Sequence, residues 1–503
     1  MVEKELKILA KGAGIFLIGM ITTKILGYLY RLIVARYLGP EEYGLLNLGF
    51  AVIGILTAFA VFGLPSGVLR YVAYFKGKSD NSRLKGVIIS SLKISLPLSI
   101  FLAIILFVLS DIISINLFHN PALSPIIKIL SIALPLFSII SILESVSQAM
   151  QLIKYNVLIR NISESAIQLI LTIILILLGY GIFGAVIGHV VAVFTSAVFF
   201  IIVIHKKVFP FLDKHIKTTN TYKELILFSW PLIFVYIFGR LQNWIDSISI
   251  GIFKSASYVG LYNAAIPTSQ LLMILPATVG ALFIPTITQL YAQNKSNEIN
   301  KLYYITNKWA FLMNFPVFLL LIIFSKQILN ILFGQQYTEA YMAMIILCIG
   351  YFLYSMIQLS SGVLQSVKKT KVLMMNTLVF SILNILLNFA LIPKYGIEGA
   401  AIATSISLIL LSVLFLIEVH KFEKLNFLKF VLLKSVLSSV IAGIFIYLIK
   451  DQIFKNNLIL NFVLLSVIFF VIYIALLFLT KSIEQEDKKL FADLLSFLRR
   501  RIT

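Results

Sequence analysis

The chain has few charged residues and almost no cysteine. Of its 503 residues, 13% are charged, about half the share of a soluble domain, and 60% are hydrophobic. Too little polar surface remains to cover a globule of this length, so the composition excludes a soluble protein and indicates an integral membrane protein. The single cysteine, Cys348, excludes an intramolecular disulfide framework, and with only five histidines beside it we expect no metal site.

The sequence also lacks long polar segments. The longest gap between apolar runs, residues 205–222, has eighteen residues, so no soluble domain fits between them. No G-x-x-x-x-G-K-[S/T] motif occurs, which excludes a phosphate-cradling loop for ATP. The large polar loops with paired carboxylates that a membrane glycosyltransferase or ligase would display are missing too. We therefore expect neither an enzyme nor a bound cofactor.

Long apolar runs fill the rest of the chain. A bilayer core about 30 Å thick needs roughly 20 mostly apolar residues per spanning helix. Fourteen runs meet this requirement and predict an all-α, polytopic membrane protein. They lie near residues 12–36, 44–68, 86–109, 125–149, 157–178, 182–204, 224–250, 258–290, 304–329, 338–365, 371–392, 397–418, 429–449 and 457–480.

The basic residues, which give a net charge of +21, are distributed unequally between alternate connections. The N-terminus, the even-numbered connections and the C-terminal tail hold thirty Lys and Arg residues, Arg160 among them, and the odd-numbered connections hold six. Because short cytoplasmic loops carry the excess of Lys and Arg, both termini are predicted to lie in the cytoplasm of a cell-membrane protein. The charge marks topology, and we expect no nucleic-acid partner.

An internal repeat joins the two halves of the chain. Residues 180–187 (YGIFGAVI) match residues 395–402 (YGIEGAAI) at an offset of 215, and residues 44–47 match residues 260–263 at an offset of 216. This offset carries the first predicted helix onto the seventh, an even number of helices later, so both copies have the same orientation in the membrane. The repeat predicts two six-helix lobes, with the YGI segments as tight outer turns.

The repeat also sets the predicted domain boundaries. Helices 13 and 14 fall outside it, and the last residues have the periodicity of a basic amphipathic helix on the inner leaflet. The predicted parts are an N-lobe at 1–204, a cytoplasmic linker at 205–222, a C-lobe at 223–420, helices 13 and 14 at 421–480, and the amphipathic cytoplasmic tail at 481–503.

Cations occur within the predicted spans. Lys24 lies near the middle of the first helix, Arg31 follows seven residues later on the same face, and the repeat maps Lys24 onto Arg240 in the seventh helix. Ionisable groups at this depth cost several kcal/mol unless they face a wet cavity or a partner. We predict a hydrated cleft that holds an anionic group. Structural pairing stays open as an alternative, with Asp246 neutralising an arginine and Lys24 reaching the interface.

Other polar residues in the spans are further candidates. Asn47 and Asn263 are matching amides in the two copies, and Asn243 follows Arg240 by one turn, so these three are substrate-binding candidates. The candidates for ion coupling are the carboxylates Asp246, Glu144 and Glu164. For Asp246, a role as ion partner and a role in coupling are weighted evenly. His189 is interpreted as a histidine of the helix bundle.

Several segments resemble a known family. Residues 31–49 (RLIVARYLGPEEYGLLNLG) resemble the junction of helices 1 and 2 in polysaccharide-biosynthesis, O-antigen-type flippases of the multidrug/oligosaccharidyl-lipid/polysaccharide exporter superfamily. Residues 64–67 (LPSG) and 395–402 are similar to other recurring segments of that family. The resemblance covers essentially the whole chain, including fourteen helices in two lobes.

The resemblance implies a flippase that moves a polyprenyl-(pyro)phosphate-linked sugar or oligosaccharide from the inner to the outer leaflet by alternating access. It implies a cationic central cavity, and its partners would be the lipid-linked glycan, membrane lipids and other polysaccharide-assembly proteins. One alternative is a cation-coupled multidrug exporter of the same superfamily, whose cleft should be acidic. Others are a lipid-linked peptidoglycan-precursor flippase, which carries a helix 2 arginine missing here, and a non-transporting scaffold of a wall-synthesis or sporulation complex.

Overall fold

The computed structural model describes residues 2–423, 430–450, 458–480 and 482, and these form helices and turns without a strand. The prediction of an all-helical protein is confirmed. The tail predicted at 481–503 lies, apart from Ser482, outside the described residues. The chain divides into two compact units: unit 1 is Met1–Ala264 with Ile385–Ala400, and unit 2 is Ala265–Asn384 with Ala401–Thr503.

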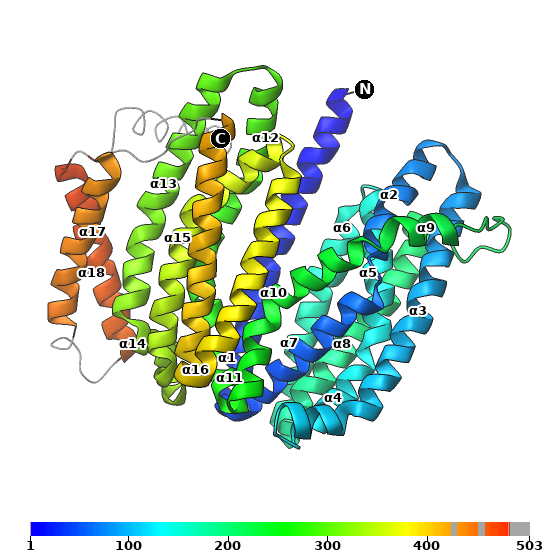
Figure 1. Ribbon diagram of the computed structural model, residues 1–503, viewed down its shortest axis with the longest axis horizontal. Coiled ribbons are helices and arrows are strands. Elements are labelled where there is room, and N and C mark those ends of the chain that lie inside the picture. Colours follow the sequence, from blue (N-terminus) through cyan, green and yellow to red (C-terminus); the bar gives the residue numbers. More distant parts are fainter. Residues whose placement is uncertain (1, 424–429, 451–457, 481, 483–503) are drawn as a thin grey trace, which may run out of the picture. The chain divides into compact units, whose positions relative to one another are not determined.

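Unit 1 is built mainly from long apolar helices (Figure 1), a form in which most backbone N–H and C=O groups pair within one segment, as hydrocarbon surroundings require. Its α-helices are α1 (Val2–Ala60), α2 (Leu64–Gly77), α3 (Asn81–Ile112), α4 (Leu123–Ser131), α5 (Ala133–Ala149), α6 (Ile153–Asn156), α7 (Ser165–Leu175), α8 (Gly181–Val203), α9 (Tyr222–Ser229) and α10 (Leu232–Phe253). Its π-helical segments are η1 (Ile113–Leu117), η2 (Val157–Glu164), η3 (Ile176–Tyr180) and η4 (Ile204–Val208). Helix α7 packs along α8, and α1 along α10.

The described residues of unit 2 also form helices. Two helices carry residues of both units, α11 (Ala256–Ser269) and α16 (Thr370–Glu423). The other elements are η5 (Gln270–Met273), α12 (Ile274–Ala292), α13 (Ser296–Ile323), α14 (Ser325–Leu332), η6 (Gln335–Ala340), α15 (Tyr341–Ser366), α17 (Phe430–Ile449) and α18 (Leu458–Leu479). Helix α17 packs against both α13 and α18, and α12 packs against α15.

Helix lengths within the described residues fit a multi-pass membrane protein. Seven helical segments are long and apolar enough to cross a bilayer, or nine if each of two bent pairs counts as one span. The three longest greatly exceed the roughly 20 residues of one crossing: Thr22–Ala60 with 39 residues, Ile153–Val208 with 56 and Lys371–Phe422 with 52. Each breaks at a glycine with positive φ, namely Gly39 (78°), Gly181 (51°) and Gly396 (58°).

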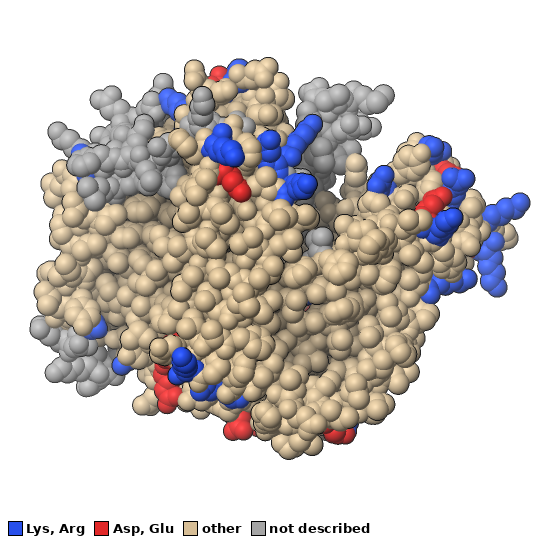
Figure 2. Space-filling view, viewed as in Figure 1, with Lys and Arg blue, Asp and Glu red and all other residues tan. Residues whose placement is uncertain are grey.

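Charged side chains gather at the ends of the helices. Figure 2 shows Lys and Arg there, whereas the surface between the ends is almost free of Lys, Arg, Asp and Glu on the face in view, where the described residues are coloured. A charged side chain is costly in hydrocarbon, so charges confined to the helix ends agree with a chain that lies across a membrane.

The segment between α8 and α9 is tied to the start of α3. Buried Lys85 donates from Nζ to the backbone oxygens of Asp213, at 2.5 Å, and Ile216, at 2.8 Å. The hydroxyls of Ser82 and Thr219 lie 2.8 Å apart and share a hydrogen bond. Because the ammonium satisfies two carbonyls, this connection lies as a fixed strap on unit 1.

Unusual backbone conformations recur along the chain at the spacing of the sequence repeat. Three pairs of residues with positive φ lie 215 positions apart. They are Ser79 and Asn294, His119 and Gly334, and Gly181 and Gly396. The last pair matches in both angles, with φ of 51° and 58° and ψ of −131° in each. Positive φ is uncommon outside glycine, so coincident positions indicate turns of the same construction.

A reciprocal pair of glycine contacts joins α1 to α11 in unit 1. A Cβ atom on Gly44 would overlap the carbonyl of Ala256, and a Cβ atom on Gly260 would overlap the carbonyl of Pro40. An offset of 216 maps Gly44 onto Gly260 and Pro40 onto Ala256, so each contact is the image of the other. Only glycine allows two backbones to approach this closely.

Candidate functional site

Unit 1 contains a cavity of about 280 Å³, bounded by both halves of α1 and by α5, η2, α7, α8 and α10. Its charged and strongly polar lining residues are Arg31, Asn47, Arg160, Glu164, Gln168, His189 and Arg240. Its aromatic lining residues are Tyr30, Tyr43, Phe50, Phe137 and Trp244. The cavity therefore combines cations, amides and rings within segments of membrane-spanning length.

Three arginines from three separate elements line the cavity. Arg31 belongs to α1, Arg160 to η2 and Arg240 to α10. Arg160 Nη1 lies 3.4 Å from Glu164 Oε2, one helical turn later. Among the described residues, neither Arg31 nor Arg240 has a carboxylate within ion-pair distance. Three guanidinium groups facing one carboxylate give the cavity a positive charge that suits an anionic ligand.

Aromatic rings form one wall of the cavity. The His189 ring packs with Phe50 at a centroid distance of 4.7 Å and with Phe137 at 6.0 Å. The guanidinium carbon of Arg160 lies 5.6 Å from the Phe137 ring centroid, within cation–π range. His189 Nδ1 is buried and has no hydrogen-bond partner among the described residues. A hydroxyl group on a ligand is a suitable partner for this nitrogen.

The backbone of α1 shapes the other side of the cavity. A Cβ atom on Gly54 would lie 2.6 Å from Trp244 Nε1, so the indole approaches α1 at a position where only glycine leaves room. Asn47, buried one turn after Tyr43, donates from Nδ2 to the Tyr43 carbonyl at 2.7 Å. This bond fixes the amide and leaves its Oδ1 atom as an acceptor on the lining.

The remaining predicted substrate residues lie outside the cavity lining. Lys24 is an exposed residue of α1, one turn before Gly27, where the lining begins. Asn243 is exposed, and its amide donates to the carbonyl of Gly239 at 2.9 Å. Asn263 is buried and donates to Ser247 Oγ, at 2.9 Å, and to a backbone carbonyl one turn earlier, so it links α10 to α11. The structure thus brings together only part of the predicted substrate set.

The carboxylates proposed for ion coupling occupy three different settings. Glu164 lines the cavity beside Arg160, as described above. Asp246 is buried in α10 and accepts hydrogen bonds from Tyr262 Oη at 2.8 Å and Asn388 Nδ2 at 2.7 Å. Glu144 is half-buried in α5 and outside the lining, although it interacts electrostatically with Arg160 and Arg240. In the described part of the chain, no group of three or more His, Cys, Asp or Glu residues is placed to hold a metal ion.

Arg160 is the main cavity residue that sequence reasoning missed, because it was counted in a cytoplasmic connection. Its helical segment is continuous from Ile153 through η2, so the residue lies within the span. The spacing of Arg160 and Glu164 carries a usable signal, since a basic and an acidic residue four positions apart share one helix face. An ion pair before an apolar run indicates a partly buried face.

Known proteins resemble this chain over much of its length. The model of the family described as polysaccharide biosynthesis protein matches residues 9–291, and the MatE family model matches residues 231–390. The probable low-salt glycan biosynthesis flippase Agl15 of Haloferax volcanii is 29% identical over 189 residues, which cover 38% of this chain and 40% of that protein. The putative O-antigen transporter of Shigella flexneri is 25% identical over 388 residues, or 75% of this chain and 89% of that protein.

Among solved structures, the lipid II flippase MurJ in an inward closed conformation has the same fold. The TM-score is 0.71 at 20% identity, and the match covers 92% of this chain and 97% of that one. These relatives are named as flippases and transporters, rather than as enzymes.

Proposed function

Because this chain belongs to the polysaccharide biosynthesis protein family, we propose that it is a flippase for a polyprenyl-phosphate- or polyprenyl-pyrophosphate-linked glycan. It moves the glycan headgroup from the inner to the outer leaflet of the cell membrane by alternating access. The partners in this proposal are the lipid-linked glycan and membrane lipids, together with other polysaccharide-assembly proteins.

The observation that carries the proposal is the cationic cavity of unit 1. Arg31 and Arg240 face it without a carboxylate partner among the described residues, and Arg160 has only Glu164. Charges at membrane depth are stable only beside water or a counter-ion, so a cavity built this way favours an anionic occupant. The phosphate of a polyprenyl-linked sugar supplies that anion, since guanidinium groups bind phosphate by paired hydrogen bonds.

The rest of the lining suits a sugar. A glycan loses its hydrogen bonds to water on leaving the aqueous phase, at several kcal/mol per polar group unless they are replaced. Asn47 and Gln168 offer amide groups, and Trp244 offers an aromatic face and an N–H donor. The prenyl chain needs no such replacement and stays in the lipid phase.

Topology supports transport between leaflets. The three longest helical segments break at glycines and are each long enough for two crossings, so the nine spans of the described residues provide twelve of the fourteen crossings in this proposal. The coincident positive-φ residues and the reciprocal contacts of Gly44 and Gly260 support two lobes related by a parallel repeat. With both termini cytoplasmic, such lobes can rock about one axis and expose the cavity to each side in turn.

A multidrug exporter of the same superfamily is the second candidate, supported by the match of the MatE model to residues 231–390. Its amphipathic cationic substrates need an acidic cavity, whereas this one holds three arginines and one glutamate. A peptidoglycan precursor also carries a pyrophosphate, so the cavity charge fits it too. Comparison of lipid-linked precursors in the assay below separates these substrates.

The coupling step is assigned to carboxylates. We retain Asp246, Glu144 and Glu164 as the proposed coupling residues, with Glu164 best placed because it already pairs with a cavity arginine. An inside-negative membrane potential favours outward movement of the phosphate by about 2.3 kcal/mol per charge per 100 mV, and can drive the cycle without an ion. Translocation measured with and without an imposed potential, Na⁺ gradient or pH gradient identifies the coupling.

The proposed function is tested with the full-length protein in proteoliposomes. A fluorescent lipid-linked oligosaccharide is incorporated, and its arrival in the opposite leaflet is measured with an impermeant quencher. Arg31→Gln or Arg240→Gln should slow translocation about tenfold or more, because each removes a charged hydrogen-bond donor to the phosphate. Lys24→Gln and Asn243→Gln test the two exposed candidates that lie outside the lining.

The matched control is Lys93→Gln. Lys93 is an exposed lysine of α3 that does not line the cavity, so its loss removes the same charge from the same unit. Unchanged translocation in folded Arg31→Gln and Arg240→Gln proteins would contradict the proposal. Accumulation of a fluorescent organic cation, rather than movement of the glycan lipid, would favour the multidrug exporter.

A further inference from the structure

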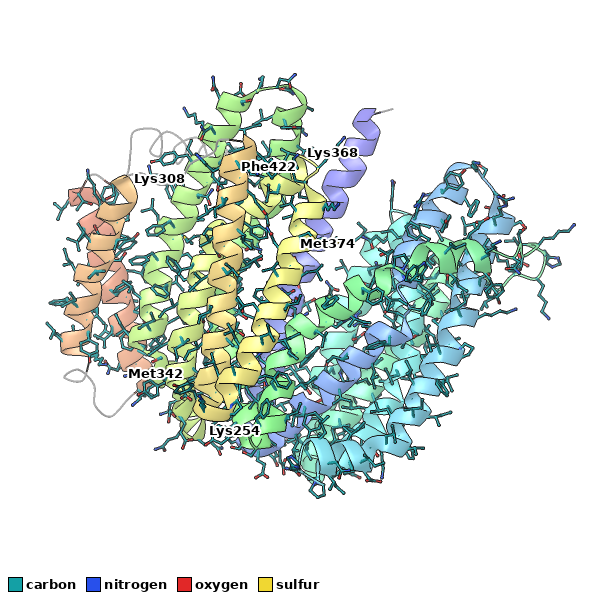
Figure 3. All side chains as sticks on the ribbon, viewed as in Figure 1. Lys254, Lys308, Met342, Lys368, Met374 and Phe422 are labelled. Atoms are coloured by element: carbon teal, nitrogen blue, oxygen red, sulfur yellow. The ribbon has the colours of Figure 1, made fainter. Side chains whose placement is uncertain are left out.

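A second concave surface lies in unit 2, apart from the arginine cavity of unit 1. A chamber of about 380 Å³ is bounded by three isoleucines and Tyr447 and by the polar or charged residues Ser325, Lys326, Gln327, Tyr341 and Lys450. It lies at the end of α15 where Tyr341 begins the helix, which the label of the next residue, Met342, marks in Figure 3.

An apolar groove of about 230 Å³ continues from this chamber between α13 and α17. It is lined by Leu319, Ile323, Val440, Gly443, Ile444 and Tyr447. Ile323 and Tyr447 line both the chamber and the groove, so the two are adjoining parts of one surface. Gly443 helps to open the groove, because a Cβ atom there would lie 3.3 Å from Ile323 Cδ1.

The chamber is positively charged. Lys326 Nζ lies 4.2 Å from the ring centroid of Tyr341, and Lys450 Nζ lies 4.1 Å from that of Tyr447. Among the residues that the structure describes, no carboxylate lines the chamber and neither ammonium has an acidic partner within ion-pair distance. The tyrosine rings hold the ammonium groups in place and leave their charge available to an anion.

The surface is polar at one end and apolar along its length. Val440 lies in α17, ten residues before Lys450 at the end of that helix, so the groove descends about 15 Å from the lysines at 1.5 Å per helical residue. This depth passes from the headgroup region into hydrocarbon. A free phosphate would use only the lysines, whereas an amphiphile with an anionic head uses the whole surface.

We propose that this surface is a binding site for an anionic glycerophospholipid of the membrane. The phosphate lies between Lys326 and Lys450, and one acyl chain lies in the groove over Leu319, Val440 and Ile444. The site lies at the outer end of the helices in the predicted topology, so the lipid comes from the outer leaflet. This site is separate from the glycan cavity, and it stands whether or not the chain flips glycans.

Lipid titration of the purified full-length protein in detergent tests the charge requirement. Native mass spectrometry compares phosphatidylglycerol with phosphatidylcholine of the same acyl chains. Phosphatidylglycerol should bind more tightly, and K326A/K450A should weaken it about 10- to 30-fold, since each lysine near a lipid phosphate contributes about fivefold. K326R/K450R should retain the affinity, and the matched control K394A, which removes an exposed lysine elsewhere, should not change it.

Two further measurements test the acyl chain. A phosphatidylglycerol with a photoreactive acyl chain should label peptides that contain Leu319–Ile323 or Val440–Tyr447 in the unaltered protein. I444W should weaken phosphatidylglycerol binding at least fivefold by filling the groove.

Several results would overturn the proposal. They are equal affinity for the two phospholipids, no effect of K326A/K450A, and labelling confined to other helices. Glycerophosphate competing as well as phosphatidylglycerol would reduce the chamber to a simple anion site. A polyprenyl phosphate that binds more tightly than phosphatidylglycerol would replace the proposed occupant. None of these results depends on translocation activity.

Discussion

The ion pair of Arg160 and Glu164 gives the proposed function its sharpest test. The two side chains lie 3.4 Å apart in the cavity and are 30% and 11% exposed. A substrate phosphate must displace Glu164 to bind Arg160, so Glu164→Gln should tighten binding of a phosphate. The attraction is about 5 kcal/mol at an effective dielectric constant of 20. Solvent screening and reorganisation of the free cavity reduce the net gain to about 1–2 kcal/mol, or about 5- to 30-fold in affinity.

Tryptophan fluorescence can measure this affinity, because Trp244 lines the same cavity. The chain has three tryptophans, and replacing Trp230 and Trp309 by Phe leaves Trp244 as the reporter. Titration with a soluble prenyl diphosphate should show tighter binding for Glu164→Gln and weaker binding for Arg160→Gln.

A double variant and a control complete the experiment. With Arg160→Gln present, Glu164→Gln should add at most a small gain, because the residue with which Glu164 pairs is gone. Glu42→Gln, which removes an exposed carboxylate from α1 outside the lining, should leave the affinity unchanged. Weaker or unchanged binding in Glu164→Gln alone would refute the competition between Glu164 and the phosphate, and with it the placement of the phosphate at Arg160.

Three further predictions concern stability and packing. Gly44→Val should lower the free energy of unfolding by about 1–3 kcal/mol, because the valine side chain would overlap the Ala256 carbonyl. Thermal melting measures this loss, and Gly27→Ala, where nothing lies within 4 Å of an added Cβ atom, should show none. Lys85→Met should destabilise unit 1 by about 2 kcal/mol, because two charged hydrogen bonds are lost. Trypsin should then cleave the strap between α8 and α9 faster, and an unchanged cleavage rate would contradict the role of Lys85 in fixing it. Asp246→Ala should cost about 2–4 kcal/mol, since it removes the charged acceptor of two buried hydrogen bonds; normal stability with lost ion dependence would instead indicate a coupling site.

Much of the fold follows from the sequence. In hydrocarbon a backbone must pair its own N–H and C=O groups, and a single segment does so as a helix, so the apolar runs predict where helices form. The turn glycines are also readable, because Gly181 and Gly396 lie in the matched YGI segments and adopt nearly the same positive φ. Single-helix boundaries are harder to predict. In the structure neighbouring runs join into one kinked helix, as in Thr22–Ala60, where Gly39 and Pro40 bend the chain without a loop.

The candidate site was only partly predictable. The cost of a cation within a membrane span marks Arg31 and Arg240 from sequence alone, and both line the cavity. Asn263 is likewise a polar residue within an apolar run, yet its amide donates a hydrogen bond to Ser247 on the neighbouring helix α10. Sequence periodicity shows that a face is polar, but the packing of helices decides whether that face meets a cavity or another polar side chain. Arg160 is different, because it lies only three residues inside the predicted run at 157–178, where a basic residue is expected to reach the interface; the structure continues that helical segment back to Ile153 and so places Arg160 deeper in the span.

The reciprocal glycine contacts have a consequence for the origin of the chain. A contact in which Gly44 meets Ala256 while Gly260 meets Pro40 is the contact that two identical half-length chains would form as a homodimer. In such an ancestor, a single glycine would have supplied both close approaches. Gene duplication and fusion would then have kept the contact intact and freed each copy to change alone.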